Sequence, residues 1–291
     1  MQLLLNALIA GSFAALLASG LALVYGVMGV FNLALGQMAL IGGYVCWWCV
    51  AVAGLPLPVA IVCSLVVSLI LAWISFDLFV QPFQRRHRFL PIVTTIALSM
   101  LLDGLILIVF HEEPRSILAS GQRLLHIGDA ILSVEQLVLI CVTILFLSVL
   151  VWVLTSTPFG RKVRATVQHP EAATSLGMNG PLLRRSLFIL SALCAACGGI
   201  YVGIDQNLSP TLGMHLTVKA YAAVIAGGRG SLKGAILFAF IIALLEQLAI
   251  GLPWFGVYIP AGYQGTVALL VIVILLLWKP EGVFGSRLRS S

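Results

Sequence analysis

Residues 3–25 read LLLNALIAGSFAALLASGLALVY, an apolar stretch without a single charge. It opens a longer uncharged run, because the first charged side chain of the chain is Asp77. A helix needs about 20 apolar residues to cross the hydrocarbon core of a bilayer. Since 76 consecutive residues without Lys, Arg, Asp or Glu cannot build a water-soluble surface, the start of the chain predicts several membrane-spanning helices.

The composition of the whole chain agrees with this prediction. Of its 291 residues, 61% are hydrophobic and 9% are charged, whereas soluble domains carry about 25% charged residues. These proportions exclude a large soluble catalytic domain. We predict an all-α polytopic membrane protein in which residues 1–291 form a single transmembrane domain, a helical bundle of about 8–9 transmembrane segments with interrupted or re-entrant helices.

Polar breaks divide the chain into nine candidate segments. Two of them are short for a span. Segment 235–250 falls slightly below the required length, and segment 216–226 either extends at one end, is re-entrant, or is a helix broken at the glycines that follow it. The nine segments are 3–25, 33–53, 58–80, 90–110, 131–154, 186–204, 216–226, 235–250 and 262–278.

The basic residues orient these segments, because short cytoplasmic loops carry an excess of Lys and Arg. Only Arg115, Arg123 and Lys219 are left for the outer side. The alternation fits nine crossings, with the N-terminus outside and the C-terminus in the cytoplasm. The net charge of +6 then reflects topology and not nucleic-acid binding, since the basic residues form no continuous stripe. The 13 residues assigned to the cytoplasmic side are Arg85, Arg86, Arg88, Arg161, Lys162, Arg164, Arg184, Arg185, Arg229, Lys233, Lys279, Arg287 and Arg289.

Four acidic side chains lie within apolar segments or near their ends. Asp77 is about one turn from a segment end and can reach the cytoplasmic interface near Arg85, so a structural role is favoured. Asp103 lies in mid-segment and must face protein or a water-filled path, so a proton relay, a substrate contact and an interhelical hydrogen bond are all open. Glu135 and Glu246 each precede a Gln near an outer segment end, where solvation at the interface is the simpler interpretation.

Two glycine-rich stretches interrupt the apolar pattern. Residues 26–37 read GVMGVFNLALGQ, and residues 227–234 read GGRGSLKG. Irregular backbone at membrane depth is tolerated only against protein or water, and paired broken segments mark the transport path in some carriers. Gly227 and Gly228 are therefore candidates for a path. The alternative is that these glycines only let helices approach closely.

The second glycine-rich stretch is not a nucleotide-binding motif. It matches neither the G-x-x-x-x-G-K-[ST] nor the G-x-G-x-x-G spacing. If ATP drives transport, the ATPase must be another polypeptide, and this chain is expected to bind no cofactor. A proton-coupled carrier needs several carboxylates or histidines along one path, and Asp103 is the one strong candidate.

The longest cytoplasmic loop, residues 155–185, carries the signature of a short helix. Pro170 suits a first helical position, and Glu171 complements the helix dipole in the first turn. Gly177 with Asn179 can end the helix.

Two apolar side chains at the end of this short helix, Leu176 and Met178, are expected to be exposed at the membrane face. They could insert into a groove on a partner protein, although an inert connecting helix fits the sequence equally well. On the opposite side, the outer loop 111–130 predicts a solvated loop, with a folded connection or a docking surface as alternatives.

Five stretches, in order along nearly the whole chain, resemble one family: the integral membrane permeases of branched-chain amino acid ABC importers, of the LivH type. Any one stretch is weak, but five in order with a compatible topology are specific. They are GLALVYGVMGVFNLALG at 20–36 with Gly43 and Tyr44, GRKVRA at 160–165, EAATSLGMN at 171–179, KAYAAVIAGGRGS at 219–231 with Gly234, and PEGVFG at 280–285.

The resemblance implies a permease of the bacterial plasma (inner) membrane that acts with four kinds of partner. These are a second, related permease in a heterodimer, two cytoplasmic ATPases that use ATP and Mg, an external solute-binding protein, and the lipid bilayer. It also implies that the cytoplasmic loop docks on an ATPase through Arg164, Glu171, Ala172, Ala173, Leu176, Gly177 and Met178. The candidates for the translocation path are Asn32, Gly36, Gln37, Asp103, Gly227 and Gly228.

The chain departs from the family pattern near the first glycine-rich stretch. Many members carry His and Glu there, where this chain has Leu35 and Gln37. Branched-chain or other apolar amino acids are the first choice of substrate, and amides, urea-like solutes, small carboxylates and sugars are alternatives. A self-sufficient secondary carrier or channel stays open as a second class. A membrane-embedded enzyme is a third, although the sequence offers it no nucleophile or metal-ligand constellation.

Overall fold

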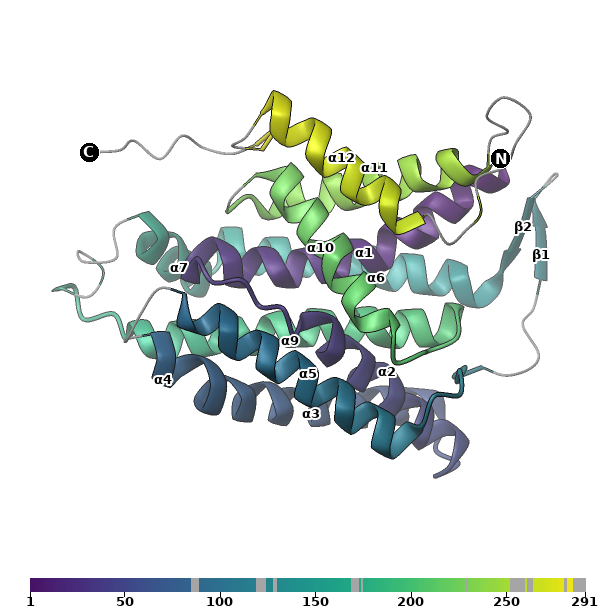
Figure 1. Cartoon of the computed structure of the whole chain (residues 1–291), viewed down its shortest axis with the longest axis horizontal. Coiled ribbons are helices and arrows are strands. Elements are labelled where there is room, and N and C mark those ends of the chain that lie inside the picture. Colours follow the sequence, from purple (N-terminus) through teal and green to yellow (C-terminus); the bar gives the residue numbers. More distant parts are fainter. Residues whose placement is uncertain are drawn as a thin grey trace.

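The computed structural model shows a bundle of helices whose axes run broadly side by side (Figure 1). Six of the described helices have the length and apolar composition of a membrane span. Each of the nine predicted segments overlaps a described helix, which confirms the predicted helical bundle. The structure describes residues 1–84, 89–118, 124–127, 130–168, 173, 175–228, 230–251, 260, 264–279 and 282–284.

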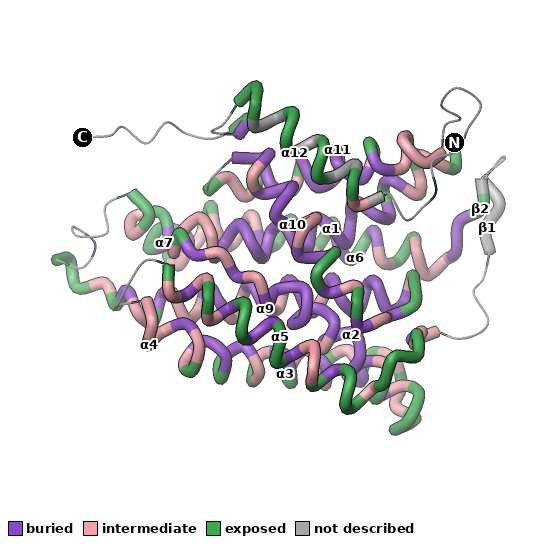
Figure 2. Tube along the Cα trace, in the orientation of Figure 1, coloured by how far each residue is buried: buried purple, intermediate pink, exposed green. Residues whose placement is uncertain are grey.

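Helix α1 (Gln2–Met28) is the centre of the bundle. Every residue of it from 9 to 24 is buried, so this helix is apolar all round and covered on all sides. It packs against α9 (Gly180–Asp205) and α11 (Leu232–Gly251). Figure 2 shows buried residues concentrated along α1 and α9, while the outer helices carry long exposed stretches.

Three outer helices each bury one stripe of residues. They are α3 (Leu57–Ser75), α5 (Leu90–Phe110) and α6 (Val134–Ser156). Their remaining faces expose large apolar side chains, as expected of helices that contact lipid. The stripe of α3 consists of small residues about four positions apart, which lets the neighbouring helices approach closely. It is formed by Ala60, Ser64, Ser68, Ala72 and Ser75.

The third predicted segment, 58–80, lies in one continuous helix that changes from α-helical to π-helical hydrogen bonding near its end. After α3 the chain continues through a π-helical stretch, η1 (Phe76–Val80), and then α4 (Gln81–Gln84). The wider π-turn inserts an extra residue and rotates the side chains that follow it. Short π-helical turns inside α-helices are rare and often lie at functional sites.

Two helices of the bundle are shorter than a full span: α2 (Leu35–Ala51) and α10 (Leu212–Gly227), with 17 and 16 residues. The predicted segment 216–226 therefore extends back to Leu212, one of the two extensions that the sequence left open. A helix of 16 residues is about 24 Å long, against about 30 Å for the hydrocarbon core. Each of the two glycine-rich stretches lies next to one of these short helices, the first before α2 and the second after α10. The last helix described is α12 (Gln264–Trp278).

One part of the structure differs from the all-α prediction. The outer loop 111–130 leads into a small antiparallel hairpin of β1 (Leu124–Ile127) and β2 (Ala130–Ser133). Nearby, the backbones of Arg115 and Leu208 exchange two hydrogen bonds of 2.9 and 2.7 Å. Backbone N–H and C=O groups outside the helices need hydrogen-bond partners, and strand pairing supplies these partners here. The described part of this loop is a folded connection held against the link between α9 and α10.

The two ends of the bundle differ in character. Figure 1 shows β1, β2 and the N-terminus at one end, which we call the hairpin end, and α4 with the amphipathic helix α7 (Pro158–Gln168) at the other. Five basic residues lie on α7 and on the first turns of α9, and we call this the basic end. They are Arg161, Lys162, Arg164, Arg184 and Arg185.

Candidate functional site

The backbone between α1 and α2 is not helical, so α2 begins inside the bundle. Helix α1 ends at Gly29, whose φ of 61° is left-handed and whose N–H donates to the Tyr25 carbonyl. The Asn32 side chain is 1% exposed, and its Oδ1 accepts a hydrogen bond of 3.2 Å from the Ala34 N–H. The Asn32 side chain thus provides an acceptor for a backbone N–H that has no helical hydrogen bond.

The first turn of α2 is fastened to α10. The Gly36 N–H donates to Thr217 Oγ1 at 2.9 Å, and the Thr217 hydroxyl donates to the Gly213 carbonyl at 2.9 Å. A Cβ on Gly36 would overlap the Gly213 carbonyl. Gly36 therefore allows the backbones of α2 and α10 to come into direct contact. Its place on the translocation path stays a prediction.

The next residue of α2 makes the polar contact at membrane depth. Gln37 is 1% exposed, and its Nε2 donates to Asp103 Oδ2 of α5 at 3.3 Å. Gln37 Oε1 and Asp103 Oδ1 are both buried and have no hydrogen-bond partner among the described residues. Both residues were predicted as candidates for the translocation path, but the hydrogen bond between them was not predicted. An amide and a carboxylate with spare acceptor capacity can bind a hydrogen-bond donor that enters the bundle.

Gly227 and Gly228 lie elsewhere, at the end of α10. Gly227 is ten residues, nearly three helical turns, along α10 from Thr217, and Gly228 follows it. Gly227 packs against the backbone of Gly234 at the start of α11, and Gly228 has a φ of 95°. Residues 283 and 284 donate backbone hydrogen bonds to 226 and 227. The structure thus places this pair in a tight junction between chain segments and apart from Gln37 and Asp103.

Between α7 and α9, the described residues of the cytoplasmic loop form an exposed helix end, residues 173 and 175–179, which we call the coupling turn. Gly177 has a φ of 78°, and the Met178 N–H donates to the Ala173 carbonyl at 3.1 Å. A left-handed Gly followed by this hydrogen bond is the Schellman ending of a helix. The predicted role of Gly177 as a helix end is confirmed.

The side chains of the coupling turn divide into an anchor and an exposed tip. Ala173 is buried, whereas Leu176 is 78% exposed and Met178 is half-buried. An exposed Leu beside buried anchors is suited to insertion into an apolar groove. The predicted contact residues Glu171 and Ala172, together with Pro170, lie outside the described residues.

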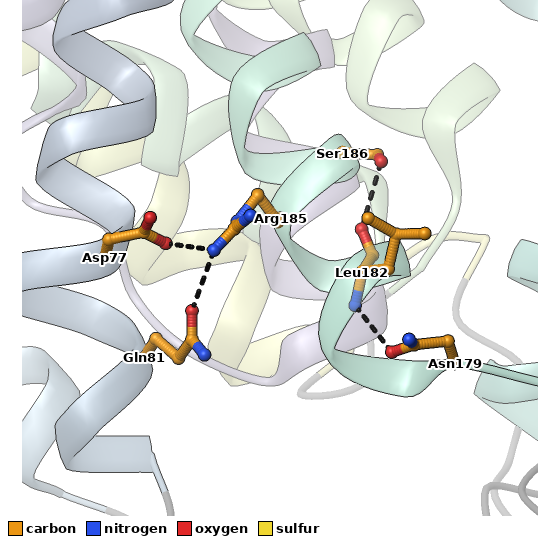
Figure 3. Close-up of polar contacts among 6 residues, drawn as sticks. All are labelled: Asp77, Gln81, Asn179, Leu182, Arg185 and Ser186. Atoms are coloured by element: carbon orange, nitrogen blue, oxygen red, sulfur yellow. Dashed lines mark hydrogen bonds and ion pairs between the residues drawn. The ribbon is translucent and has the colours of Figure 1, made fainter.

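Two predicted residues have other local tasks. The Arg164 guanidinium donates to the carbonyls of Leu154 and Thr155 and so closes the end of α6. Asn179 was expected to end the short helix together with Gly177. Instead its Oδ1 accepts from the Leu182 N–H at 3.1 Å and caps α9 (Figure 3). The reason is position: Asn179 immediately precedes α9, where an Asn side chain satisfies an otherwise free N–H.

A polar network joins the start of α9 to the π-helical stretch η1. Arg185 Nη2 lies 2.7 Å from Asp77 Oδ1 and 3.4 Å from Gln81 Oε1 (Figure 3). The side chains of the ion pair are 33% and 35% exposed. The structural role expected of Asp77 is consistent with this geometry, in which Arg185 is its basic partner. Arg85, near which Asp77 was expected to reach the interface, lies outside the described residues.

The sequence did not anticipate a second ion pair, inside the bundle. Lys219 Nζ lies 2.8 Å from Glu246 Oε2, with side-chain exposures of 15% and 2%. The expectation that Glu246 is solvated at the interface was wrong, because its side chain is buried against Lys219. The pair bridges α10 and α11, and desolvated charges need such a partner. Opposite charges on neighbouring apolar segments were the signal that could have indicated it.

Comparison with known proteins covers the whole bundle. The family described as branched-chain amino acid transport system / permease component matches residues 3–277. The permease protein BraD of Pseudomonas aeruginosa is 27% identical over 98% of this chain and 95% of its own. LivH of Escherichia coli K12 is 26% identical with the same coverage. Both are named as permease proteins of high-affinity branched-chain amino acid transport systems.

A solved structure shares the fold. It is a metal-chelate type ABC transporter in an inward-facing conformation, with a TM-score of 0.54, 17% identity, and coverage of 95% of this chain and 85% of that chain. At this identity the likeness concerns the fold alone. Because the family match spans nearly the full chain, the protein belongs to the branched-chain amino acid transport system permease components, the membrane-spanning permease subunits of ABC-type transporters.

Proposed function

We propose that this chain, as a single permease domain of nine membrane crossings, forms part of an ATP-driven importer of branched-chain or other apolar amino acids. Its partners are a second, related permease, two cytoplasmic ATPases and an external solute-binding protein. The names of the full-length relatives support the substrate class. Amides, urea-like solutes, small carboxylates and sugars are the alternatives. ATP and Mg belong to the ATPases, and this chain needs no cofactor of its own.

The observation that carries the proposal is the coupling turn. Its exposed Leu176 stands at the basic end of the bundle, and the turn runs directly into α9, a central helix. A partner that binds the turn can therefore displace α9, a helix of the core, and not only a peripheral loop. From α9 the Arg185–Asp77 pair carries the displacement to η1.

The distribution of charge supports the orientation. Because cytoplasmic loops are rich in Lys and Arg, the basic end faces the cytoplasm of the bacterial inner membrane, where the ATPases are. The hairpin end and the N-terminus face outward, toward the solute-binding protein. Nine crossings place the C-terminus in the cytoplasm.

For the path itself, the cluster at the start of α2 offers the needed chemistry. Asp103 and Gln37 present acceptor oxygens to the ammonium group of an amino acid, and Asn32 and Gly36 hold the backbone that carries them. Gly227 and Gly228 form the junction about which α10 and α11 turn when access alternates. The solute crosses next to short helices because they leave room that full spans would fill.

The test is transport by the assembled importer in proteoliposomes. With ATP inside and the loaded binding protein outside, L-leucine uptake should depend on both. The variant Leu176→Asp should reduce uptake and ATPase copurification more than 10-fold, because a charge cannot enter an apolar groove. The matched variant Leu176→Met keeps the apolar tip and should retain both. Leucine uptake by the chain alone, driven by an ion gradient without ATP, would establish a secondary carrier instead.

A further inference from the structure

A cavity of about 420 Å³ opens within the bundle near its hairpin end. Its walls come mainly from α1, α9 and α10, with single residues of α6, α11 and α12. The volume lies within the range of about 300–1,000 Å³ that is typical of small-ligand sites. None of the predicted path residues lines it, so it is separate from the cluster at the start of α2.

The lining of this cavity is divided between two kinds of side chain. The apolar part includes Ile9 and Phe13 of α1 and Leu216 of α10. The polar part combines amides with groups of both charges, which is unusual for a cavity inside a membrane protein. The polar residues are Asn6, Gln136, Asp205, Gln206, His215, Lys219 and Gln247.

The acid at the mouth of the cavity is held in place. Asp205, the last residue of α9, accepts a hydrogen bond of 2.8 Å from Gln136 Nε2. Gln136 is itself fixed, because it takes part in the capping box that begins α6. A carboxylate has room for several hydrogen bonds at once, so Asp205 keeps acceptor capacity toward the cavity.

The base of the cavity lining, Lys219, lies on α10 about two helical turns after the first residue of that helix. Lys219 lines both this cavity and a much smaller one beside it, where Glu246 also lies. Its ammonium group has three donors, and Glu246 accepts from it at 2.8 Å. The buried Glu246 carboxylate holds the Lys219 side chain in position at the wall of the cavity.

We propose that this cavity binds an amino acid as a zwitterion on its way from the outer side. Lys219 binds the carboxylate, Asp205 and the surrounding amide oxygens accept from the ammonium group, and Ile9 with Phe13 covers an apolar side chain. The assignment rests on the proposed import function and names a solute site within this one subunit. It adds a selection step before the solute reaches Asp103.

The test is protection of an engineered cysteine by leucine. His215 lines the cavity one turn from Lys219, and His215→Cys in the assembled importer should react with a membrane-impermeant methanethiosulfonate added outside. L-Leucine, supplied on the binding protein, should slow this reaction at least 5-fold. Glu112→Cys, exposed at the same end, should react at a rate that leucine does not change, and the wild-type chain gives the background of native cysteines.

A charge-free variant tests the role of Lys219. The variant Lys219→Met/Glu246→Leu with His215→Cys leaves neither member of the ion pair buried alone. The leucine concentration that halves the reaction rate of the cysteine should be at least 10-fold higher than in His215→Cys alone. Leucine uptake by the wild-type importer is measured first, so a lack of ATP-driven uptake counts against the proposed function alone. If uptake is normal but His215→Cys is unreactive, or reacts equally with and without leucine, the cavity is not a solute site.

Discussion

Arg185 Nη2 lies 2.7 Å from Asp77 Oδ1, and this ion pair joins two helices that are 108 residues apart in the sequence. On one side is the start of α9, capped by Asn179 of the coupling turn. On the other is the π-helical stretch η1, where the winding of the third segment already departs from the α-helix. The pair therefore stands between the surface that meets the ATPase and an outer helix of the bundle.

Breaking this ion pair should affect coupling more than folding. Because both side chains are about one third exposed, Arg185→Ala or Asp77→Asn should destabilise the fold by no more than about 1 kcal/mol. ATP-driven leucine uptake should nevertheless fall several-fold, while thermal unfolding in detergent shifts little. The exchanged pair Asp77→Arg/Arg185→Asp should recover part of the uptake. Single variants with full uptake would show that the pair only supports the fold.

The buried pair Lys219–Glu246 should behave in the opposite way. Lys219→Met removes the ammonium partner of a carboxylate that is 2% exposed, and removal of one member of a buried pair typically costs about 3–5 kcal/mol. The double variant Lys219→Met/Glu246→Leu replaces the pair by apolar side chains and should recover most of the loss. Melting temperatures of the purified importer measure both. A double variant no more stable than the single one would contradict this account.

Gly36 and Gly104 form a matched pair of glycines. A Cβ on Gly36 would overlap the Gly213 carbonyl, whereas a Cβ on Gly104 meets nothing within 4 Å. Gly36→Ala should therefore separate α2 from α10 and destabilise the protein by about 1–3 kcal/mol, while Gly104→Ala should leave the melting temperature unchanged. Equal melting temperatures for the two variants would mean that the contact between α2 and α10 is loose.

The conformation of Gly177 gives a prediction about the coupling turn. Its φ of 78° is poorly accessible to a β-branched residue and tolerated by Asn. Gly177→Val should deform the turn and reduce ATPase binding and uptake by about 10-fold or more, while Gly177→Asn should keep most of both. Membrane insertion, followed by the amount of chain in washed membranes, should be normal in each case. Equal activity of the Val and Asn variants would show that the conformation of the coupling turn does not matter for coupling to the ATPase.

Asp103 allows the charge on the proposed path to be tested. Asp103→Asn keeps a hydrogen-bonding group beside Gln37 but removes the negative charge that attracts a solute ammonium. The KM for leucine should rise about 10-fold with an unchanged melting temperature. Asp103→Leu, which also strands the buried Gln37 amide, should lower the melting temperature as well. If Asp103→Asn transports like the wild type, Asp103 is an interhelical contact only.

The helices themselves could be predicted from the sequence because each depends on a local property. A run of apolar residues needs no partner to be recognised, and the nine runs all correspond to helices. The beginning of α10 stayed open between Leu212 and Leu216 because Gly213 and His215 weaken the apolar pattern there, and only packing against α2 shows that they are helical. The strand pair β1–β2 was missed for a similar reason, since four residues on each side give little pattern.

The polar contacts depend on tertiary structure and could not be derived in the same way. Gln37 and Asp103 were each identified as polar side chains at membrane depth, but their pairing depends on the angle between α2 and α5. The sequence predicted a structural role for Asp77 but no partner, and its partner Arg185 lies 108 residues away. Lys219 and Glu246 looked like charges at the ends of segments, and the packing of α10 against α11 made them a buried pair.

The central position of α1 has a consequence for the biogenesis of the protein. Helix α1 is synthesised before the helices that cover it, because α9 and α11 follow it in the chain by more than 150 residues. Until then its small-residue surface, with Ser12 and Ser19, faces lipid or the insertion machinery in place of its native neighbours. The bundle therefore cannot assemble helix by helix in the order of translation. Its stable core closes only when the last third of the chain has entered the membrane, so chains truncated before α9 should be substrates for membrane proteases.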